Sequence, residues 1–299
     1  MNKRYLRLIW LTITALILAA AAARIAFGSI DSSPPSKASE MLWPLDRSGK
    51  NVILLRIPAP YAGVSSAAEA QNKLLYPNGQ NQPGGAIFAD LLFEGLWPEL
   101  TPRTNENSAE FRVPGGGAVM AALVHSGAKD DFRGRHYDAL QQRYDSAVEQ
   151  ARHVCITPIP PSRAAVVCHD REQPDVKPPK YGLQRLGIDF EKYPDVPELE
   201  RIWTGKEDIY YQRSSSGDLK VMILCSPEEV KVISTGPGIH LFPQCEQEFV
   251  FEPMNALVSI SYQRIYLENW KSIQSKWERL LQSFIAADSA KNSEDRTKK

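Results

Sequence analysis

The sequence has no net charge and lacks the short motifs that identify common enzymes. Its 35 basic side chains balance 35 acidic ones, whereas nucleic-acid-binding proteins usually carry a basic excess. A Gly-x-Ser-x-Gly elbow, a phosphate-binding loop, a Gly-x-Gly-x-x-Gly fingerprint and a His-Glu-x-x-His motif are all missing. We therefore expect no nucleic-acid partner, no cofactor, no metal site and no catalytic residue, and we expect the protein not to be an enzyme.

The composition is nevertheless that of a folded protein. Hydrophobic residues make up 43% of the chain and charged residues 23%, which excludes general disorder. At roughly 150 residues per domain, 299 residues predict about two domains. The 22 prolines outnumber the 18 glycines, which indicates many loops and strand edges.

The first 28 residues have the pattern of an export signal. They hold four basic residues and no acid, and an apolar run from Leu8 to Ala23 ends in small residues. Residues 1–28 are predicted to be a signal peptide or an N-terminal membrane anchor, with residues 5–28 in the inner membrane if they are not cleaved. A buried core helix is the alternative. Without this segment the chain has 31 basic and 35 acidic residues, so the exported body is mildly acidic at −4.

Export makes disulfides the default state of the cysteines. Cys225 ends a strand-like run and Cys245 follows 20 residues later, which suits a bridge that closes a hairpin loop and contributes about 3 kcal/mol. Cys155 and Cys168 bracket a second loop in the same manner. Because a histidine lies beside or near each of them, a zinc site is the alternative there, although zinc ligands are usually spaced more closely.

Changes in composition along the chain predict its domains. Residues 29–40 are polar and contain proline, as a tether does, and residues 171–180 hold prolines and charges that are typical of a linker. The linker divides a first α/β domain at 41–170 from a second α+β domain at 181–286. Residues 287–299 are predicted to be a disordered tail.

The first domain is predicted to combine strands with a helix. Apolar runs of strand length cover 51–57, 86–93 and 118–125. From Arg135 onward, apolar residues recur at helical spacing with charges between them, which predicts an amphipathic helix.

The second domain is predicted to be two hairpins covered by a helix. Residues 208–212 and 219–225 flank a serine-rich turn, and 248–251 and 257–263 form a second pair. From 267 to 284, apolar residues recur every three or four positions and include Trp270 and Trp277, as in a helix that packs on a sheet. The predicted fold class is α+β, with two domains that are each a mainly antiparallel sheet packed by helices.

Three other tryptophans lie near a proline or a turn. They are candidates for contact with a partner, because tryptophan is enriched at the energetic centres of interfaces: Trp43, Trp97 and Trp203.

The carboxyl end resembles the C-terminal module of exported immunity proteins that neutralise type VI secretion effectors, especially lipase effectors. The resemblance rests on Cys225 and Cys245, on Phe249, on the alternating run LVSISYQR, and on Tyr266-Leu267 followed by Trp270 and Ile273. The segment FEGLWPELTPRTNEN is similar to the first module of the same proteins through Trp97-Pro98, Thr104, Glu106 and Asn107. Together these segments extend the resemblance over about residues 41–286.

The resemblance implies a two-domain protein that binds a cognate toxin in the periplasm and occludes its active site. It supplies no residue of the interface, because that surface varies with the toxin. The chain departs from lipoprotein members, since no cysteine precedes Cys155 to carry a lipid. Two other functions stay open from the residues alone: a membrane-tethered envelope or assembly component that binds a partner complex, and a periplasmic hydrolase whose catalytic residues are distant in sequence.

Overall fold

The structure is a computed structural model, and all of the elements described here belong to one unit, Pro35–Lys299. The description covers residues 38–46, 51–61, 91–112, 118–126, 136–156, 167–170, 174–187, 208–228, 233–236 and 239–286. The predicted leader at 1–28 and the predicted tail at 287–299 lie outside these residues, as does most of the predicted tether at 29–40. Within the described ranges, no helix has both the length and the apolar character needed to cross a membrane.

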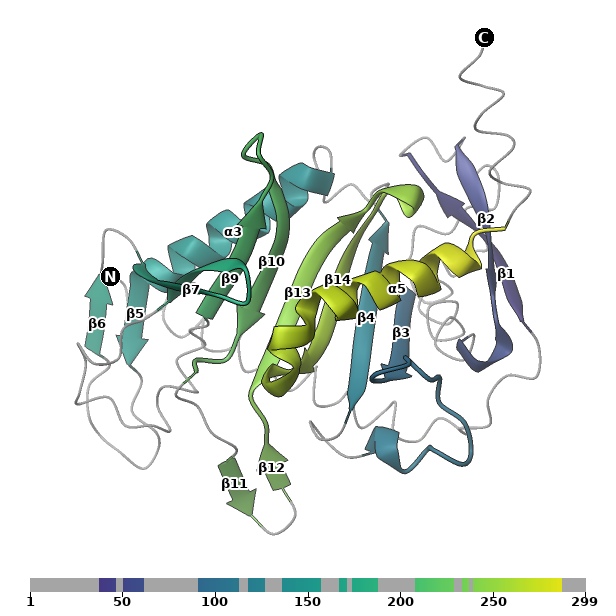
Figure 1. Cartoon of the computed structure of the whole chain (residues 1–299), viewed down its shortest axis with the longest axis horizontal. Coiled ribbons are helices and arrows are strands. Elements are labelled where there is room, and N and C mark those ends of the chain that lie inside the picture. The colour runs from purple at the N-terminus through teal and green to yellow at the C-terminus, as the bar shows by residue number, and fades with distance from the viewer. Residues whose placement is uncertain are drawn as a thin grey trace, which may run out of the picture. The chain divides into compact units, whose positions relative to one another are not determined.

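An eight-stranded antiparallel sheet organises the unit (Figure 1). Its first half in spatial order is β3 (Leu91–Leu96), β4 (Val119–Ser126), β14 (Ala256–Gln263) and β13 (Gln244–Phe251). Its second half is β10 (Leu219–Cys225), β9 (Asp208–Arg213), β8 (Leu183–Gly187) and β7 (Asp175–Lys180). The α+β class, the antiparallel sheet and the C-terminal helix are as predicted.

The predicted domain boundary does not separate two sheets. Strand β4 from the first predicted domain pairs with β14 from the second, so that Ser126 lies opposite Ala256. The predicted linker at 171–180 contains strand β7, which pairs with β8 through a turn at Tyr181 and Gly182.

Residues 171–180 have the composition of a linker although they contain strand β7, and the position of this strand in the sheet explains why. It lies at the edge of the sheet, and its register shifts between Lys177 and Lys180, where two prolines lie. An edge strand tolerates proline at such a shift because the missing N–H is not needed for a ladder. Tyr181 and Gly182 both have positive φ, 56° and 77°, as a two-residue hairpin turn requires.

The two faces of the sheet pack against different helices. In Figure 1, α5 (Trp270–Phe284) crosses in front of β13, β14 and β4, whereas α3 (His136–Arg152) lies behind β9 and β10. Because neighbouring residues of a strand point to opposite faces, Val221 and Ile223 of β10 join the core beneath α5, and Met222 joins the one beneath α3.

Helix α5 has the apolar stripe that its sequence predicted. The buried residues recur at steps of three and four, which is the period of a helix with one face on a sheet: Trp270, Ile273, Trp277, Leu281 and Phe284. The 3₁₀ segment η4 (Arg264–Asn269) leads into the helix and buries Leu267. After the helix, the Ala286 amide donates to the carbonyl of Leu54 at 2.9 Å, which attaches the residue pair that follows α5 to β2.

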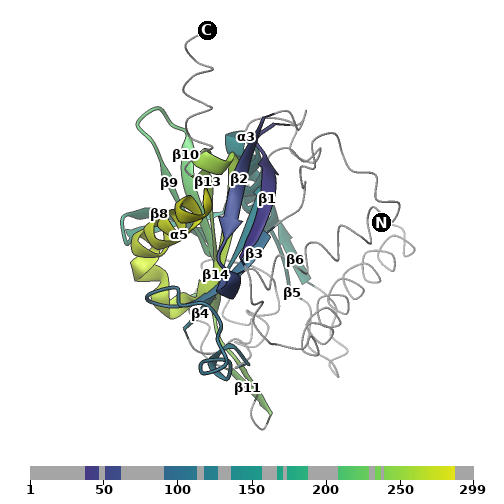
Figure 2. The same ribbon diagram turned by 90° about the vertical axis from the view of Figure 1, so that its right-hand side faces the viewer.

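A separate hairpin of β1 (Ser39–Pro44) and β2 (Val52–Ile57) lies beside α5 (Figure 2). Trp43 of β1 is fully buried, and its Nε1 donates to the carbonyl of Met254 at 2.7 Å. Asn255 donates through Nδ2 to the carbonyl of Leu45 at 2.6 Å. The expectation that Trp43 faces a partner is therefore wrong, because this side chain joins the hairpin to the main core.

The remaining elements are short. Two further two-stranded sheets are described, β5 (His153–Ile156) with β6 (Val167–Asp170), and β11 (Ile233–Gly236) with β12 (Ile239–Leu241). Two more 3₁₀ turns are η1 (Glu110–Arg112) and η3 (Glu252–Met254). The turn after η3 is closed by Asn255 at φ 44°, a conformation that asparagine adopts more readily than most residues.

Candidate functional site

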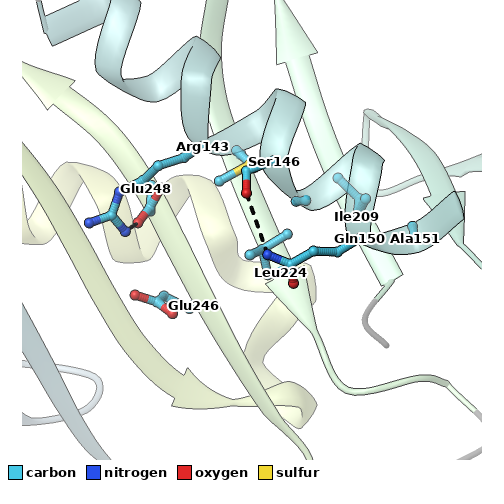
Figure 3. Close-up of a pocket in the computed structure, with 10 residues that line it drawn as sticks. Arg143, Ser146, Gln150, Ala151, Ile209, Leu224, Glu246 and Glu248 are labelled. Atoms are coloured by element: carbon cyan, nitrogen blue, oxygen red, sulfur yellow. Dashed lines mark hydrogen bonds and ion pairs between the residues drawn. The ribbon is translucent and has the colours of Figure 1, made fainter. Parts of the chain in front are cut away.

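A pocket of about 220 Å³ lies between helix α3 and strands β9, β10 and β13 (Figure 3). Its apolar lining comprises Ala147 and Ala151 from the helix and Ile209, Met222 and Leu224 from the strands. Its polar lining comprises Arg143, Ser146 and Gln150 from the helix and Glu246 and Glu248 from β13. One small space thus combines hydrocarbon surface with charged groups.

Two carboxylates and one guanidinium determine the charge of this pocket. Arg143 reaches from α3 to form an ion pair with Glu248, whose side chain is only 1% exposed (Figure 3). Glu246 is two residues earlier in the same strand and therefore shares its face, where it accepts a hydrogen bond from Ser259 Oγ at 2.5 Å. The charged residues that line the pocket sum to one negative charge.

The lining residues favour binding over nucleophilic chemistry. They include no histidine and no cysteine, and Ser146 Oγ accepts from Gln150 Nε2 at 3.4 Å. A serine nucleophile needs an adjacent base to take its proton, and a glutamine amide cannot serve as one. The arrangement can hold a cationic or hydrogen-bonding group next to an apolar surface.

A second polar cluster lies on the opposite face of the sheet, around Asp208 at the start of β9. This carboxylate is 1% exposed and forms ion pairs with three cations: Lys177 at 3.2 Å, Arg185 at 2.7 Å and Arg264 at 2.9 Å. Oδ2 also accepts the backbone N–H of Glu228 at 3.1 Å. Through these contacts, Asp208 links β7, β8, η4 and the loop after β10.

The outer edge of this cluster is more exposed. Glu228, whose side chain is 43% exposed, pairs with Lys180 and, at 2.8 Å, with Arg185. The hydrogen bond from Lys180, assisted by the positive charge of Arg185, lowers the pKa of Glu228 to about 2. Beneath them, burial raises the pKa of Tyr210 to about 12, and the Tyr210 hydroxyl accepts a hydrogen bond from Arg264 at 2.7 Å.

A disulfide between Cys225 and Cys245 closes the base of the segment that connects β10 to β13, as predicted. The two cysteines lie directly opposite each other, and both are buried. Ser226 and Gln244 continue the ladder beyond the bridge, with the Ser226 amide donating to the Gln244 carbonyl at 2.9 Å. Arg264 Nη1 donates to the carbonyl of Ser226, so the Asp208 cluster and the disulfide support the same base.

No family model matches the chain, and no curated protein matches it. Among solved structures, the chain is similar to an immunity protein of the Stenotrophomonas maltophilia type IV secretion system. The two share 19% sequence identity and a TM-score of 0.44, over 78% of this chain and 90% of that chain. These values are too low to transfer a function from one protein to the other.

The other predicted bridge is only partly described. Cys155 of β5 lies opposite Cys168 of β6 in the strand register, but their side chains lie outside the described residues, so the second disulfide stays a prediction. Among the described residues, no group of three or more His, Cys, Asp or Glu side chains could hold a metal ion.

Of the two remaining candidate tryptophans, only Trp97 lies within the described residues. Trp97 is partly buried, with its ring 6.3 Å from that of Tyr266, and Lys276 Nζ lies 5.2 Å from the Trp97 ring centroid. Trp203 lies outside the described residues. The structure therefore places Trp97 against the middle of α5, at Lys276, and against the 3₁₀ segment η4, at Tyr266.

The sequence did not single out the acidic residues that organise both clusters. Asp208 stands at the start of an apolar strand, where an acidic residue is typical of a turn. The three cations that pair with it come from segments that are distant in the sequence. Glu246 and Glu248 give a better signal, because acids at alternate positions of an apolar strand must share one face. That alternation would have indicated a charged patch on β13.

Proposed function

We propose that the protein is a periplasmic immunity protein that binds and neutralises a cognate toxin of a type VI secretion system, of the lipase type, by stoichiometric occlusion of its active site. In this proposal the protein acts by binding alone, needs no cofactor and is not an enzyme. A leader at 1–28 exports it and, if retained, anchors it in the inner membrane.

The Cys225–Cys245 disulfide is the observation that carries the proposal. Disulfides persist in oxidising compartments such as the bacterial periplasm and are rare in the cytosol. This bridge is buried between two central strands, so it belongs to the scaffold of the fold. A toxin delivered to the periplasm would be met there by a protein that stays folded in that compartment.

The residues behind the resemblance also form one structural group. Phe249, Leu267 and Ile273 are at most 3% exposed and belong to the core that contains the disulfide. From the first segment, the carbonyl of Pro98 accepts from Lys276 Nζ of α5 at 2.7 Å. The two segments quoted for the resemblance therefore meet at α5.

The polar residues of the first segment have a local role that fits a rigid binder. The amide of Thr104 donates to Asn107 Oδ1 at 2.6 Å, and the amide of Asn107 donates to Thr104 Oγ1 at 3.3 Å. A hydrogen bond from the Thr104 side chain is the main cause that lowers the pKa of Glu106. A loop closed in this way loses less conformational entropy on association, which favours tight inhibition.

Co-expression tests the proposal. The toxin encoded next to this gene is directed to the periplasm of a sensitive host, with and without the full-length protein. We expect growth to be restored by the exported protein and lost again when its leader is deleted. The purified pair should form a complex of fixed stoichiometry that inhibits the toxin's lipase activity.

Stoichiometry separates binding from catalysis. If the protein inhibits by occupying the active site, the toxin molecules in excess of it stay active, so we expect residual lipase activity to fall linearly with added protein and to reach zero at a fixed molar ratio. If the exported wild-type protein is stable but does not protect cells from a toxin that kills in the periplasm, the proposed function is wrong.

A further inference from the structure

We infer that the pocket between α3 and β13 is a receptor site for one basic side chain, an arginine or lysine, of the toxin. The inference rests on the proposed function, since it names a contact of that complex. It is carried by the size of the pocket, by its apolar floor and by its negative charge.

The size of the pocket matches a single side chain. Ligands of drug size occupy roughly 300–1,000 Å³, whereas this pocket measures about 220 Å³. Its floor includes Met222, which is fully buried, and Leu224. Arginine and lysine lay their methylene stems on such apolar surface while their charged ends reach polar groups.

The charged end would meet Glu246 and Glu248. Arg143 already pairs with Glu248, and the side chain of Glu246 stands separately on the same strand face in Figure 3. A second cation at this position would bring the charge of the lining residues from −1 to zero. An anionic group would instead meet two carboxylates with one guanidinium, which disfavours acidic ligands.

The charge of the whole exported body points to the same partner chemistry. The chain beyond residue 28 has 35 acidic and 31 basic residues, so its field attracts a basic partner and raises the association rate. The pocket would then give this general attraction a specific point of contact, because a buried methylene stem and a paired charge fix the position of the bound side chain.

Nuclear magnetic resonance of methionine methyl groups tests the pocket in the protein alone. The chain has five methionines; Met222 lies in the pocket, while Met120 and Met254 are buried in the other core. Titration with arginine amide should shift the Met222 methyl signal saturably, in the millimolar range, and leave the other two unchanged. Citrulline amide, which has nearly the same shape and the same α-ammonium group but a neutral urea in place of the guanidinium, should bind at least about tenfold more weakly.

Glu246→Gln is the decisive variant. It keeps the acceptor for Ser259 while removing the charge, and Glu268→Gln, an exposed change on η4, is the control. We expect Glu246→Gln to weaken both arginine amide and the toxin by about tenfold, with Glu268→Gln within about twofold of wild type. An absent Met222 shift, equal binding of citrulline amide, or unchanged toxin affinity in Glu246→Gln would each overturn the inference.

The two proposals fail in different ways. If the pocket binds arginine amide but the protein does not rescue cells from any neighbouring toxin, the proposed function is wrong, and the contact with the toxin is wrong as well. If rescue succeeds and Glu246→Gln protects as well as wild type at limiting expression, the immunity role stands and the pocket inference alone is wrong.

Discussion

Substituting Asn for Asp208 should destabilise the protein strongly. Asp208 is 1% exposed and lies within 3.2 Å of the charged nitrogens of Lys177, Arg185 and Arg264. Asn has nearly the same shape but no charge, so the three cations would keep their positions and lose their shared counterion. Breaking a buried ion pair in this way costs about 3–5 kcal/mol, because uncompensated charge stays out of water.

Glu228→Gln is a matched control at the same guanidinium. Glu228 also pairs with Arg185, but its side chain is 43% exposed. Exposed ion pairs are screened by water and contribute about 0–1 kcal/mol. The two substitutions each remove one negative charge from a partner of Arg185, so the difference between them compares a buried carboxylate that has three cations with an exposed one that has two.

Equilibrium unfolding in urea provides the measurement. Tryptophan fluorescence should give two-state curves with equal slopes, so that midpoints convert to free energies of unfolding. A second change, Arg264→Gln in the Asp208→Asn background, should recover part of the loss because it removes one uncompensated cation. The reasoning is refuted if Asp208→Asn costs less than about 1 kcal/mol, or no more than Glu228→Gln does.

Three further outcomes follow from the structure. Replacing Cys225 and Cys245 together by Ala should lower the free energy of unfolding by about 3 kcal/mol, measured in urea, because the bridge closes a loop of 20 residues; an unchanged midpoint would contradict this. Trp277→Ala should cost about 3–5 kcal/mol in the same assay, because this large side chain is fully buried. Glu228, whose pKa is lowered from 4.5 to about 2, should stabilise the fold above pH 4.5 and lose this effect as the pH falls toward 2. The urea midpoint of Glu228→Gln should therefore approach that of wild type as the pH is lowered through this range.

Local patterns in the sequence were enough to predict the hairpins and the last helix. The β9–β10 and β13–β14 pairs and helix α5 are confirmed, because each depends on alternation, spacing and turn residues that are close in the chain. Of the strand predicted at 86–93, residues 91–93 belong to β3 (Leu91–Leu96), and residues 86–90 lie outside the described residues. The bounds of β3 are set by pairing with β4, which a single segment does not reveal.

Long-range contacts account for most of what the sequence did not predict. Trp43 was a candidate for partner contact because it lies beside a proline, yet its indole N–H donates a hydrogen bond to the carbonyl of Met254, which is 211 residues away. The Asp208 cluster likewise brings together residues from separate strands, so no window of sequence contains it. For the pocket, alternation in β13 could indicate that Glu246 and Glu248 share a face, but the position of Arg143 depends on how α3 packs.

Strand β13 allows stability and binding to be tested separately. Cys245, Gln247 and Phe249 face the core beneath α5, where Gln247 Oε1 accepts a hydrogen bond from the Tyr262 hydroxyl at 3.1 Å. Glu246 and Glu248 alternate with them and face α3. Because adjacent residues point to opposite faces, Glu246→Gln leaves the disulfide and the α5 core in place. A loss of toxin binding at unchanged free energy of unfolding would therefore assign the contact to the α3 face. Loss of the bridge, by contrast, should weaken the fold on which both faces depend.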